Sequence, residues 1–175
     1  TRASVKIQEG CNQICAYCIV PKVRGREKSI DKKLITNEIN DLHERGYKEI
    51  ILTGTQLGTY GFDLINENLE TLIKFIMTET SIERLRISSI QAHEISEDLL
   101  EIYRQYSQRI CNHFHLALQS GSNNILKLMR RKYNNNDYLK AVNLIKSNLI
   151  SPSISTDVIV GFPGETEKDF NDTLK

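Results

Sequence analysis

The 175-residue sequence lacks several features that assign a chain to a class at once. It contains no tryptophan, no low-complexity tract and no internal repeat. No apolar run approaches the ~18 to 20 residues of a membrane span, so we expect no membrane association. The chain shows no signal peptide and only four cysteines, which argues against the disulfide framework of a secreted domain. A formal net charge of +1 leaves any nucleic-acid contact to a local basic patch.

The chain has enough apolar material for one globular domain, because 39% of its residues are hydrophobic. It begins at Thr1 without a methionine and stops inside a helix-like segment, 167–174. We therefore expect residues 1–175 to form one domain cut from a longer protein.

Short apolar runs alternate with amphipathic stretches along the sequence. Strands are expected at 4–8, 49–53, 84–88, 114–118 and 154–160, and helices at 34–45, 69–76, 99–106 and 138–145. Gly46 is placed to end the first helix, and Thr166 to cap a further one with Asp169 three residues on. This alternation predicts an α/β fold whose parallel sheet collects its ligands at the carboxyl ends of the strands.

Three cysteines lie within eight residues, in Gly10-Cys-Asn-Gln-Ile-Cys-Ala-Tyr-Cys-Ile-Val-Pro21. The thiols of Cys11, Cys15 and Cys18 can all turn inward around one centre. A structural zinc normally takes four protein ligands, and an iron–sulfur cube has four irons, so three thiols leave one position open. A zinc site completed by the distant His113 or His115 is the alternative that this spacing leaves open.

Polar or glycine-rich segments follow each later strand and should meet at one rim beside the cysteines. They are Gly54–Gly58, Ser88–Ser89, Gln119–Ser122 and Gly161–Gly164. Ser88, Ser89, Gln119 and Asp157 are expected to offer polar contacts to a ligand there.

The cysteine spacing, with Tyr17 just before the third cysteine, resembles the signature of the radical S-adenosylmethionine (radical SAM) enzymes. Six segments in order are similar to the radical SAM methylthiotransferases: 6–11, 24–29, 52–55, 86–89, 118–122 and 157–166. These enzymes add a methylthio group to a tRNA adenosine or to a ribosomal-protein aspartate. Segments 54–61 and 129–133 look most like the branch that modifies N6-threonylcarbamoyladenosine beside the tRNA anticodon. The branches for isopentenyladenosine and the ribosomal-protein aspartate usually have glycine at the position of Lys132, and they are the alternatives.

The resemblance implies a partial (β/α) barrel, truncated after about the fifth βα unit. It further implies a [4Fe-4S] cluster on Cys11, Cys15 and Cys18, with S-adenosylmethionine on its open iron. Tyr17 would lie near the adenine, and Gly54, Thr55 and Gln56 at the methionine end of this cofactor. Its ribose and carboxylate would be contacted by Ser88, Ser89, Gln119 and Asp157. No side chain is expected to act as a catalytic acid, base or nucleophile, because the cofactor carries the chemistry. The N-terminal domain for a second cluster and the C-terminal RNA-binding barrel are expected outside residues 1–175.

The expected partners are the tRNA anticodon loop and an electron donor protein, in the cytoplasm. Arg130, Arg131 and Lys132 would contact phosphates, and Tyr133 would stack on a base. The four histidines, at 43, 93, 113 and 115, show no pairing for acid–base work, and Cys111 is interpreted as a small buried hydrophobe. A non-catalytic zinc- or cluster-bearing RNA-binding module is the alternative from another class.

Overall fold

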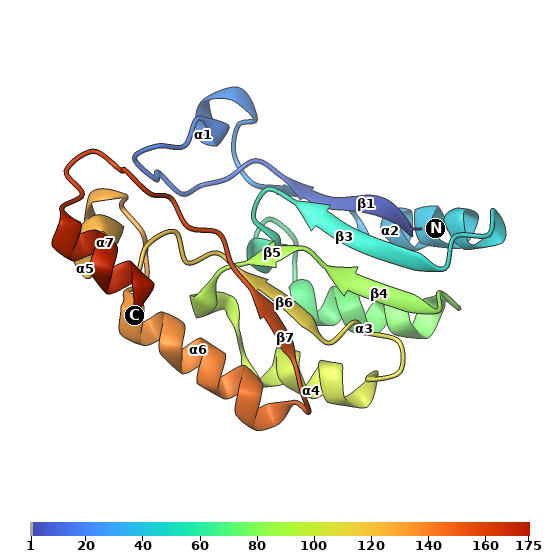
Figure 1. The fold of residues 1–175 in the computed structure, drawn as a ribbon. Helices are drawn as coiled ribbons and strands as arrows, with labels where there is room; N and C mark the ends of the chain where they lie inside the picture. The colour runs from blue at the N-terminus through green and yellow to red at the C-terminus, as the bar shows by residue number, and fades with distance from the viewer. Residues whose placement is uncertain (1) are drawn as a thin grey trace.

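The computed structural model describes residues 2–175, which form a curled sheet with helices on one side (Figure 1). The sheet has two hydrogen-bonded parts, with strand orders β2-β1-β3-β4 and β5-β6-β7. The strands are β1 (Arg2–Glu9), β2 (Lys28–Ser29), β3 (Glu49–Gly54), β4 (Arg84–Ile87), β5 (Ser89–Ile90), β6 (His113–Leu116) and β7 (Ser153–Ser155). The pairs β1–β3, β3–β4, β5–β6 and β6–β7 are parallel, so the predicted parallel α/β fold is confirmed.

Four helices run along one face of the sheet (Figure 1): α2 (Lys32–Glu44), α3 (Leu69–Glu79), α4 (Glu97–Gln105) and α6 (Asn135–Asn148). Three short helices lie beyond the ends of the strands: α1 (Val20–Val23), α5 (Asn123–Leu128) and α7 (Glu167–Leu174). Short 3-10 turns lie at η1 (Leu57–Thr59) and η2 (Ala92–Glu94). The main core lies between strands and helices, and its members include Val5, Ile50, Ile39, Leu72 and Ile102, each fully buried.

Side chains alternate across each strand, so the residues between the core positions point to the opposite, inner face of the sheet. This inner face is polar: it carries Thr53 from β3, Arg86 from β4 and His115 from β6. The charges there are paired, as Arg86 Nε donates to Glu49 Oε1 at 2.8 Å. No helix of the described residues is long and apolar enough to cross a bilayer.

The last strand is much shorter than predicted. Residues 154–160 were expected to be extended, but β7 covers Ser153–Ser155, and Val158 forms only an isolated parallel bridge with Gln119. The reason is Thr156, whose hydroxyl donates to Leu116 O at 2.6 Å and accepts from Leu118 N at 3.0 Å. Hydrogen bonds to the Thr156 side chain thus replace the backbone hydrogen bonds that would continue the strand.

Other element boundaries depend on local capping. The helix expected from residue 34 begins at Lys32, because the Asp31 side chain accepts a hydrogen bond from Lys33 N. Gly46 has φ +89° and follows this helix, as predicted. Thr166 and Asp169 form the predicted capping box of α7. Strand β2, which is antiparallel to β1, and helix α5 were not predicted, because both are short.

Candidate cofactor site

The cysteine loop leaves the carboxyl end of β1 and folds over the turn at residues 24–27. Gly10 makes this possible with φ +76°, since a Cβ there would lie 2.0 Å from Arg26 O. Cys11 N donates to Gly25 O at 3.1 Å, and Asn12 N donates to Glu27 Oε1 at 3.0 Å. In Figure 1 this loop and α1 lie at the end of the molecule that also holds α5 and α7.

Hydrogen-bond donors face two of the three sulfurs, those of Cys11 and Cys15. Gln13 N donates to Cys11 Sγ at 3.3 Å, and Arg131 Nη1 lies 3.5 Å from Cys15 Sγ. Burial raises the pKa of the Cys11 thiol, and the charges of Glu27, Cys15 and Cys18 raise it further, against the opposing hydrogen bond from Gln13. N–H donors aimed at sulfur suit thiolate ligands of a metal centre. Nevertheless, no three Cys, His, Asp or Glu side chains among residues 2–175 surround one point closely enough to hold a single metal ion.

Gln8 at the end of β1 joins the cysteine loop to the loop after β3. Its Nε2 donates to Gly10 O at 2.9 Å. Its Oε1 accepts from Thr55 N at 3.0 Å and from Gln56 N at 2.9 Å. The structure therefore places Gly54, Thr55 and Gln56 beside the cysteine loop, as expected, although Gln8 already occupies two of their N–H groups.

The Gln56 side chain is turned into the protein, where it belongs to a buried network that the sequence did not reveal. Gln91 Nε2 donates to Gln56 Oε1 at 2.7 Å, and Gln56 Nε2 donates to Glu94 Oε1. Gln91 N donates to Glu94 Oε2 at 2.8 Å. Burial raises the pKa of Glu94. A Cβ on Gly58 would lie 2.2 Å from the Glu94 carboxyl carbon, so this network sets the path of the loop after β3.

Tyr17 and Gln119 meet across the rim. The Tyr17 hydroxyl donates to Gln119 Oε1 at 3.1 Å, and Arg131 Nη1 lies 3.4 Å from the same hydroxyl. Gln119 has φ +67°, a left-handed conformation that is uncommon outside glycine. Residues that are about a hundred positions apart in sequence thus converge on the cysteine loop. Ser88 and Ser89 lie where β4 passes into β5, and Ser89 is exposed.

Asp157 lies on the rim next to Gln119, whose backbone N donates to Asp157 O at 2.9 Å. Its carboxylate is hydrogen bonded to His115, with Asp157 Oδ2 and His115 Nε2 3.0 Å apart. The sequence showed no histidine pairing for acid–base work, but the structure pairs His115 with Asp157. The sequence could have indicated this pair. Alternation places residues 113 and 115 on one face of their strand, and residues 155 and 157 on one face of the next expected strand.

The basic run after α5 does not form one surface patch. Arg130 and Lys132 are exposed, whereas Arg131 is half-buried against Cys15 and Tyr17. Tyr133 is 4% exposed, and its hydroxyl donates to Leu118 O at 2.8 Å. The predicted stacking of Tyr133 on an exposed base is wrong, because this ring packs beneath the Arg131 guanidinium. The distance from Arg131 Cζ to the centroid of the Tyr133 ring is 4.9 Å.

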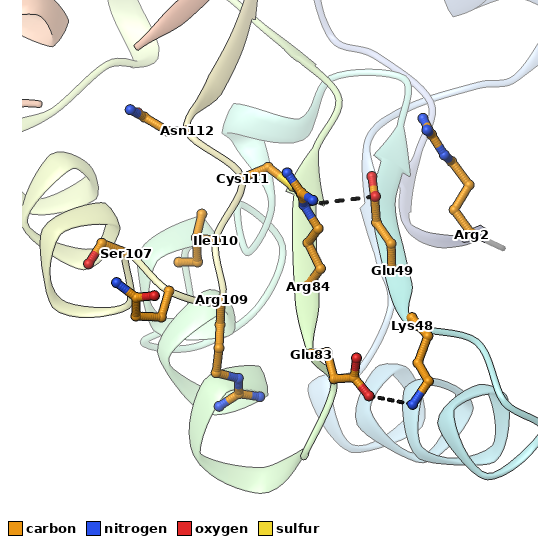
Figure 2. A pocket seen from close by; sticks show the side chains of 11 residues that line it. Arg2, Lys48, Glu49, Glu83, Arg84, Ser107, Arg109, Ile110, Cys111 and Asn112 are labelled. Carbon is orange, nitrogen blue, oxygen red and sulfur yellow. Dashed lines mark hydrogen bonds and ion pairs between the residues drawn. The ribbon is translucent and has the colours of Figure 1, made fainter. Parts of the chain in front are cut away.

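A separate hollow of about 770 Å³ lies at the amino ends of the strands, away from the cysteine loop (Figure 2). Arg84 and Glu49 approach to 3.9 Å there, and Lys48 pairs with Glu83. Cys111 is buried as predicted, but its sulfur also accepts a hydrogen bond from Arg84 Nε at 2.9 Å. Because ligands of parallel α/β folds bind at the carboxyl ends, this hollow is not the candidate site.

A parallel half-barrel that carries a three-cysteine loop beyond its first strand defines the class of the protein. The sequence profile of the Radical SAM superfamily matches residues 5–175. The chain belongs to this superfamily.

Several relatives of the chain are tRNA-modifying enzymes. The chain is 46% identical to a tRNA-2-methylthio-N(6)-dimethylallyladenosine synthase from Clostridium tetani, over 100% of this chain and 39% of that protein. It is 45% identical to a threonylcarbamoyladenosine tRNA methylthiotransferase from Aquifex aeolicus, over 99% of this chain and 42% of that protein. The chain thus spans about two fifths of the length of these relatives, and overall identity does not separate their two substrates.

The fold is shared with solved structures of much lower sequence similarity. One is a radical S-adenosylmethionine methyltransferase, TsrM, from Kitasatospora setae, with cobalamin and a [4Fe-4S] cluster bound. It has a TM-score of 0.74 and 14% identity, over 98% of this chain and 33% of that one. This likeness supports the predicted partial barrel.

Proposed function

We propose that residues 1–175 are the radical SAM core of a tRNA methylthiotransferase. The observation that carries the proposal is the three-thiol loop at the carboxyl rim, with Arg131, Tyr17 and Gln119 around it. Similarity to two kinds of tRNA methylthiotransferase over the whole chain supports the reaction class. The domains for a second cluster and for RNA binding belong, in this proposal, to parts of the protein outside this core.

Cys11, Cys15 and Cys18 would hold a [4Fe-4S] cluster, and S-adenosylmethionine would bind beside it. The N–H groups aimed at Cys11 and Cys15 fit a thiolate set. The bound group supplies one-electron chemistry that activates an inert C–H bond.

The residues around the loop would bind and orient the cofactor rather than react. Tyr17 and Arg131 offer a hydroxyl and a guanidinium beside Cys15, and Arg131 suits the cofactor carboxylate. The loop of Gly54, Thr55 and Gln56 is held by Gln8 in the position proposed for the methionine end. Gln119, Asp157, Ser88 and Ser89 would supply the polar contacts to the ribose.

The proposed substrate is N6-threonylcarbamoyladenosine beside the tRNA anticodon, on the basis of segments 54–61 and 129–133. Arg130 and Lys132 are exposed and free to contact phosphates, whereas Arg131 faces the cysteine loop. An electron donor protein would reduce the cluster, and the cytoplasm is the compartment in which tRNA and such a donor meet.

The first experiment tests the metal. Reconstituted without oxygen, the protein should bind about four irons with matching sulfide per chain. Cys11→Ala, Cys15→Ala and Cys18→Ala should each abolish this binding, whereas Cys111→Ala, the control, should retain it. S-adenosylmethionine should also change the electron paramagnetic resonance spectrum of the reduced cluster. Stoichiometric zinc with tetrahedral ligation by X-ray absorption would contradict the proposal and support the binding-module alternative.

The second experiment tests the substrate. Deletion of the gene should remove 2-methylthio-N6-threonylcarbamoyladenosine from cellular tRNA, as measured by mass spectrometry of nucleosides, and the intact gene should restore it. If that nucleoside persists while methylthio-isopentenyladenosine or the modified ribosomal-protein aspartate disappears, the reaction class stands and the substrate assignment fails.

A further inference from the structure

Four polar side chains form one hydrogen-bonded row on the inner face of the sheet. His113 Nε2 lies 3.1 Å from Ser155 Oγ, and the same oxygen lies 2.9 Å from His115 Nδ1. His115 Nε2 lies 3.0 Å from Asp157 Oδ2. The row follows from the parallel pairing of β6 and β7, which sets His113 opposite Ser153 and His115 opposite Ser155. It ends at the rim that carries the cysteine loop.

The proton positions in this row are fixed by donor and acceptor counts once Asp157 is ionised. The carboxylate only accepts, so His115 Nε2 carries a proton, and in neutral His115 the Nδ1 atom accepts. The Ser155 hydroxyl must then donate to His115 and accept from His113 Nε2–H. The remaining atom, His113 Nδ1, is left bare, and it is buried without a hydrogen-bond partner within residues 2–175.

The surroundings favour this neutral arrangement of His113. Burial lowers the pKa of His113, and the charge of the nearby Arg86 lowers it further. Arg86, on β4, is paired with Glu49 of β3, so this carboxylate is not free to draw a proton onto His113. Each hydrogen bond of the row is therefore donated in the same direction, from His113 towards Asp157.

At the rim, only one carboxylate oxygen of Asp157 is used. Oδ2 is bound to His115, and the Asp157 side chain is 71% exposed. Its backbone is fixed to Gln119, which in turn accepts a hydrogen bond from Tyr17 in the cysteine loop. A held carboxylate with a free oxygen is an acceptor for O–H or N–H donors, such as the two hydroxyls of a ribose.

We propose that His115 is a positioning residue, which holds the Asp157 carboxylate in place to accept hydrogen bonds from the ribose hydroxyls of a nucleoside ligand. Ser155 and His113 fix the tautomer of His115. This inference rests on the proposed function, since the ligand is either S-adenosylmethionine or the adenosine of tRNA. The chemistry at Asp157 is the same for both.

The tautomers are tested first, in the protein without cofactor. Long-range ¹H–¹⁵N NMR of the side chains should show both His113 and His115 protonated on Nε2 and bare on Nδ1. Ser155→Ala should change the signals of both rings, while His43→Gln, a control on α2, should change neither. A His115 protonated on Nδ1 would overturn the proposed row.

Affinity is tested next, with reconstituted protein and two ligands: S-adenosylmethionine, and an anticodon stem-loop RNA. His115→Leu should weaken one of them about tenfold or more, as Asp157→Asn does, because a hydrogen bond to a charged group is lost or misdirected. The double variant should be no worse than Asp157→Asn, and His115→Gln, which can still donate to Asp157, should restore part of the loss. The affected ligand identifies the source of the ribose.

The outcomes separate the two proposals. Wild-type protein that binds no S-adenosylmethionine contradicts the proposed function. Wild-type protein that binds it, with His115→Leu and Asp157→Asn unchanged towards both ligands and still folded by circular dichroism, overturns only the inference about His115.

Discussion

Gly10 and Gly25 have almost the same backbone conformation, with φ +76° and +74°, but very different surroundings. A Cβ on Gly10 would lie 2.0 Å from Arg26 O, whereas a Cβ on Gly25 would have no atom within 4 Å. Alanine at either position has the same left-handed strain of about 1 to 2 kcal/mol. Only Gly10→Ala adds a collision with backbone, so the pair isolates the effect of that contact on the cysteine loop.

We expect Gly10→Ala to lose most of its iron after anaerobic reconstitution, while Gly25→Ala keeps nearly all of it. The measurement is iron and sulfide per chain, with circular dichroism to show that both variants stay folded. Equal iron content in the two variants would mean that the loop does not depend on the close approach of Gly10 to Arg26.

The positions of single residues were predicted best where a strand end decides them. Gln119 was expected beside the cysteine loop, and Tyr17 of that loop contacts it. The role of the three thiols as ligands stays a prediction from their spacing. Arg131 and Tyr133 could not be placed, because whether a side chain in a basic run faces solvent depends on which loop packs over it. Glu94 was missed because its burial depends on two hydrogen-bond partners that no motif marks. Gln56 is distant in sequence, and Gln91 is a glutamine in a loop.

Asp169 links two helices at their amino ends. It belongs to the capping box of α7, and its Oδ1 also accepts from Ser122 Oγ, the cap of α5, at 2.6 Å. Hydrogen bonds from Ser122 and then Thr166 lower the pKa of Asp169 to about 2, from an ordinary value of about 3.9. Its contribution to stability is therefore complete above pH 4 and is lost as the pH falls towards 2.

Asp169→Asn should accordingly lower the free energy of unfolding at neutral pH, and the difference from wild type should shrink between pH 4 and pH 2. Urea denaturation at a series of pH values measures this. Asp172→Asn, one turn on and bonded only to Lys175 at 3.2 Å, is the matched control. A difference that does not change with pH would show that the ionised form of Asp169 is not what joins the helices.

Helices and strands with strong periodicity were predicted correctly, whereas several of their ends were not. The amphipathic stretches became α2, α3, α4 and α6, because an apolar stripe must be buried whatever its neighbours are. The end of β7 could not be predicted, since it depends on the Thr156 hydroxyl reaching Leu116 on another strand. Strand β2 needs β1 as its template, a pairing that its two residues do not reveal.

At the scale of the whole molecule, the charge balance limits how this core can hold RNA. A net charge of +1 gives no general attraction for phosphates, and Arg130 and Lys132 are the exposed cations of the proposed contact. With two phosphates contacted, log K should fall with log salt at a slope of about −1.4 to −1.8. Fluorescence anisotropy with tRNA at several salt concentrations gives this slope directly.

Arg130→Gln and Lys132→Gln should each reduce the steepness of that slope by about 0.7 to 0.9. Lys22→Gln, a change to a cation of α1 that is not part of the proposed contact, should leave it unchanged. A steep slope that survives both substitutions would show that tRNA binds to a different face of the core.

The ribosome synthesises the cysteine loop early, but the residues that hold this loop in place are synthesised much later. Ala16 N donates to Met129 O at 3.1 Å, and Arg131 contacts Cys15, so these supports lie about 110 residues after the thiols. Ribosomes add ~5 to 20 residues per second, so the thiols emerge roughly 6 to 22 s before their supports. During that interval the thiols must stay reduced and free of stray metal. Cells that supply iron and sulfide only after synthesis of this segment would give the highest yield of loaded protein.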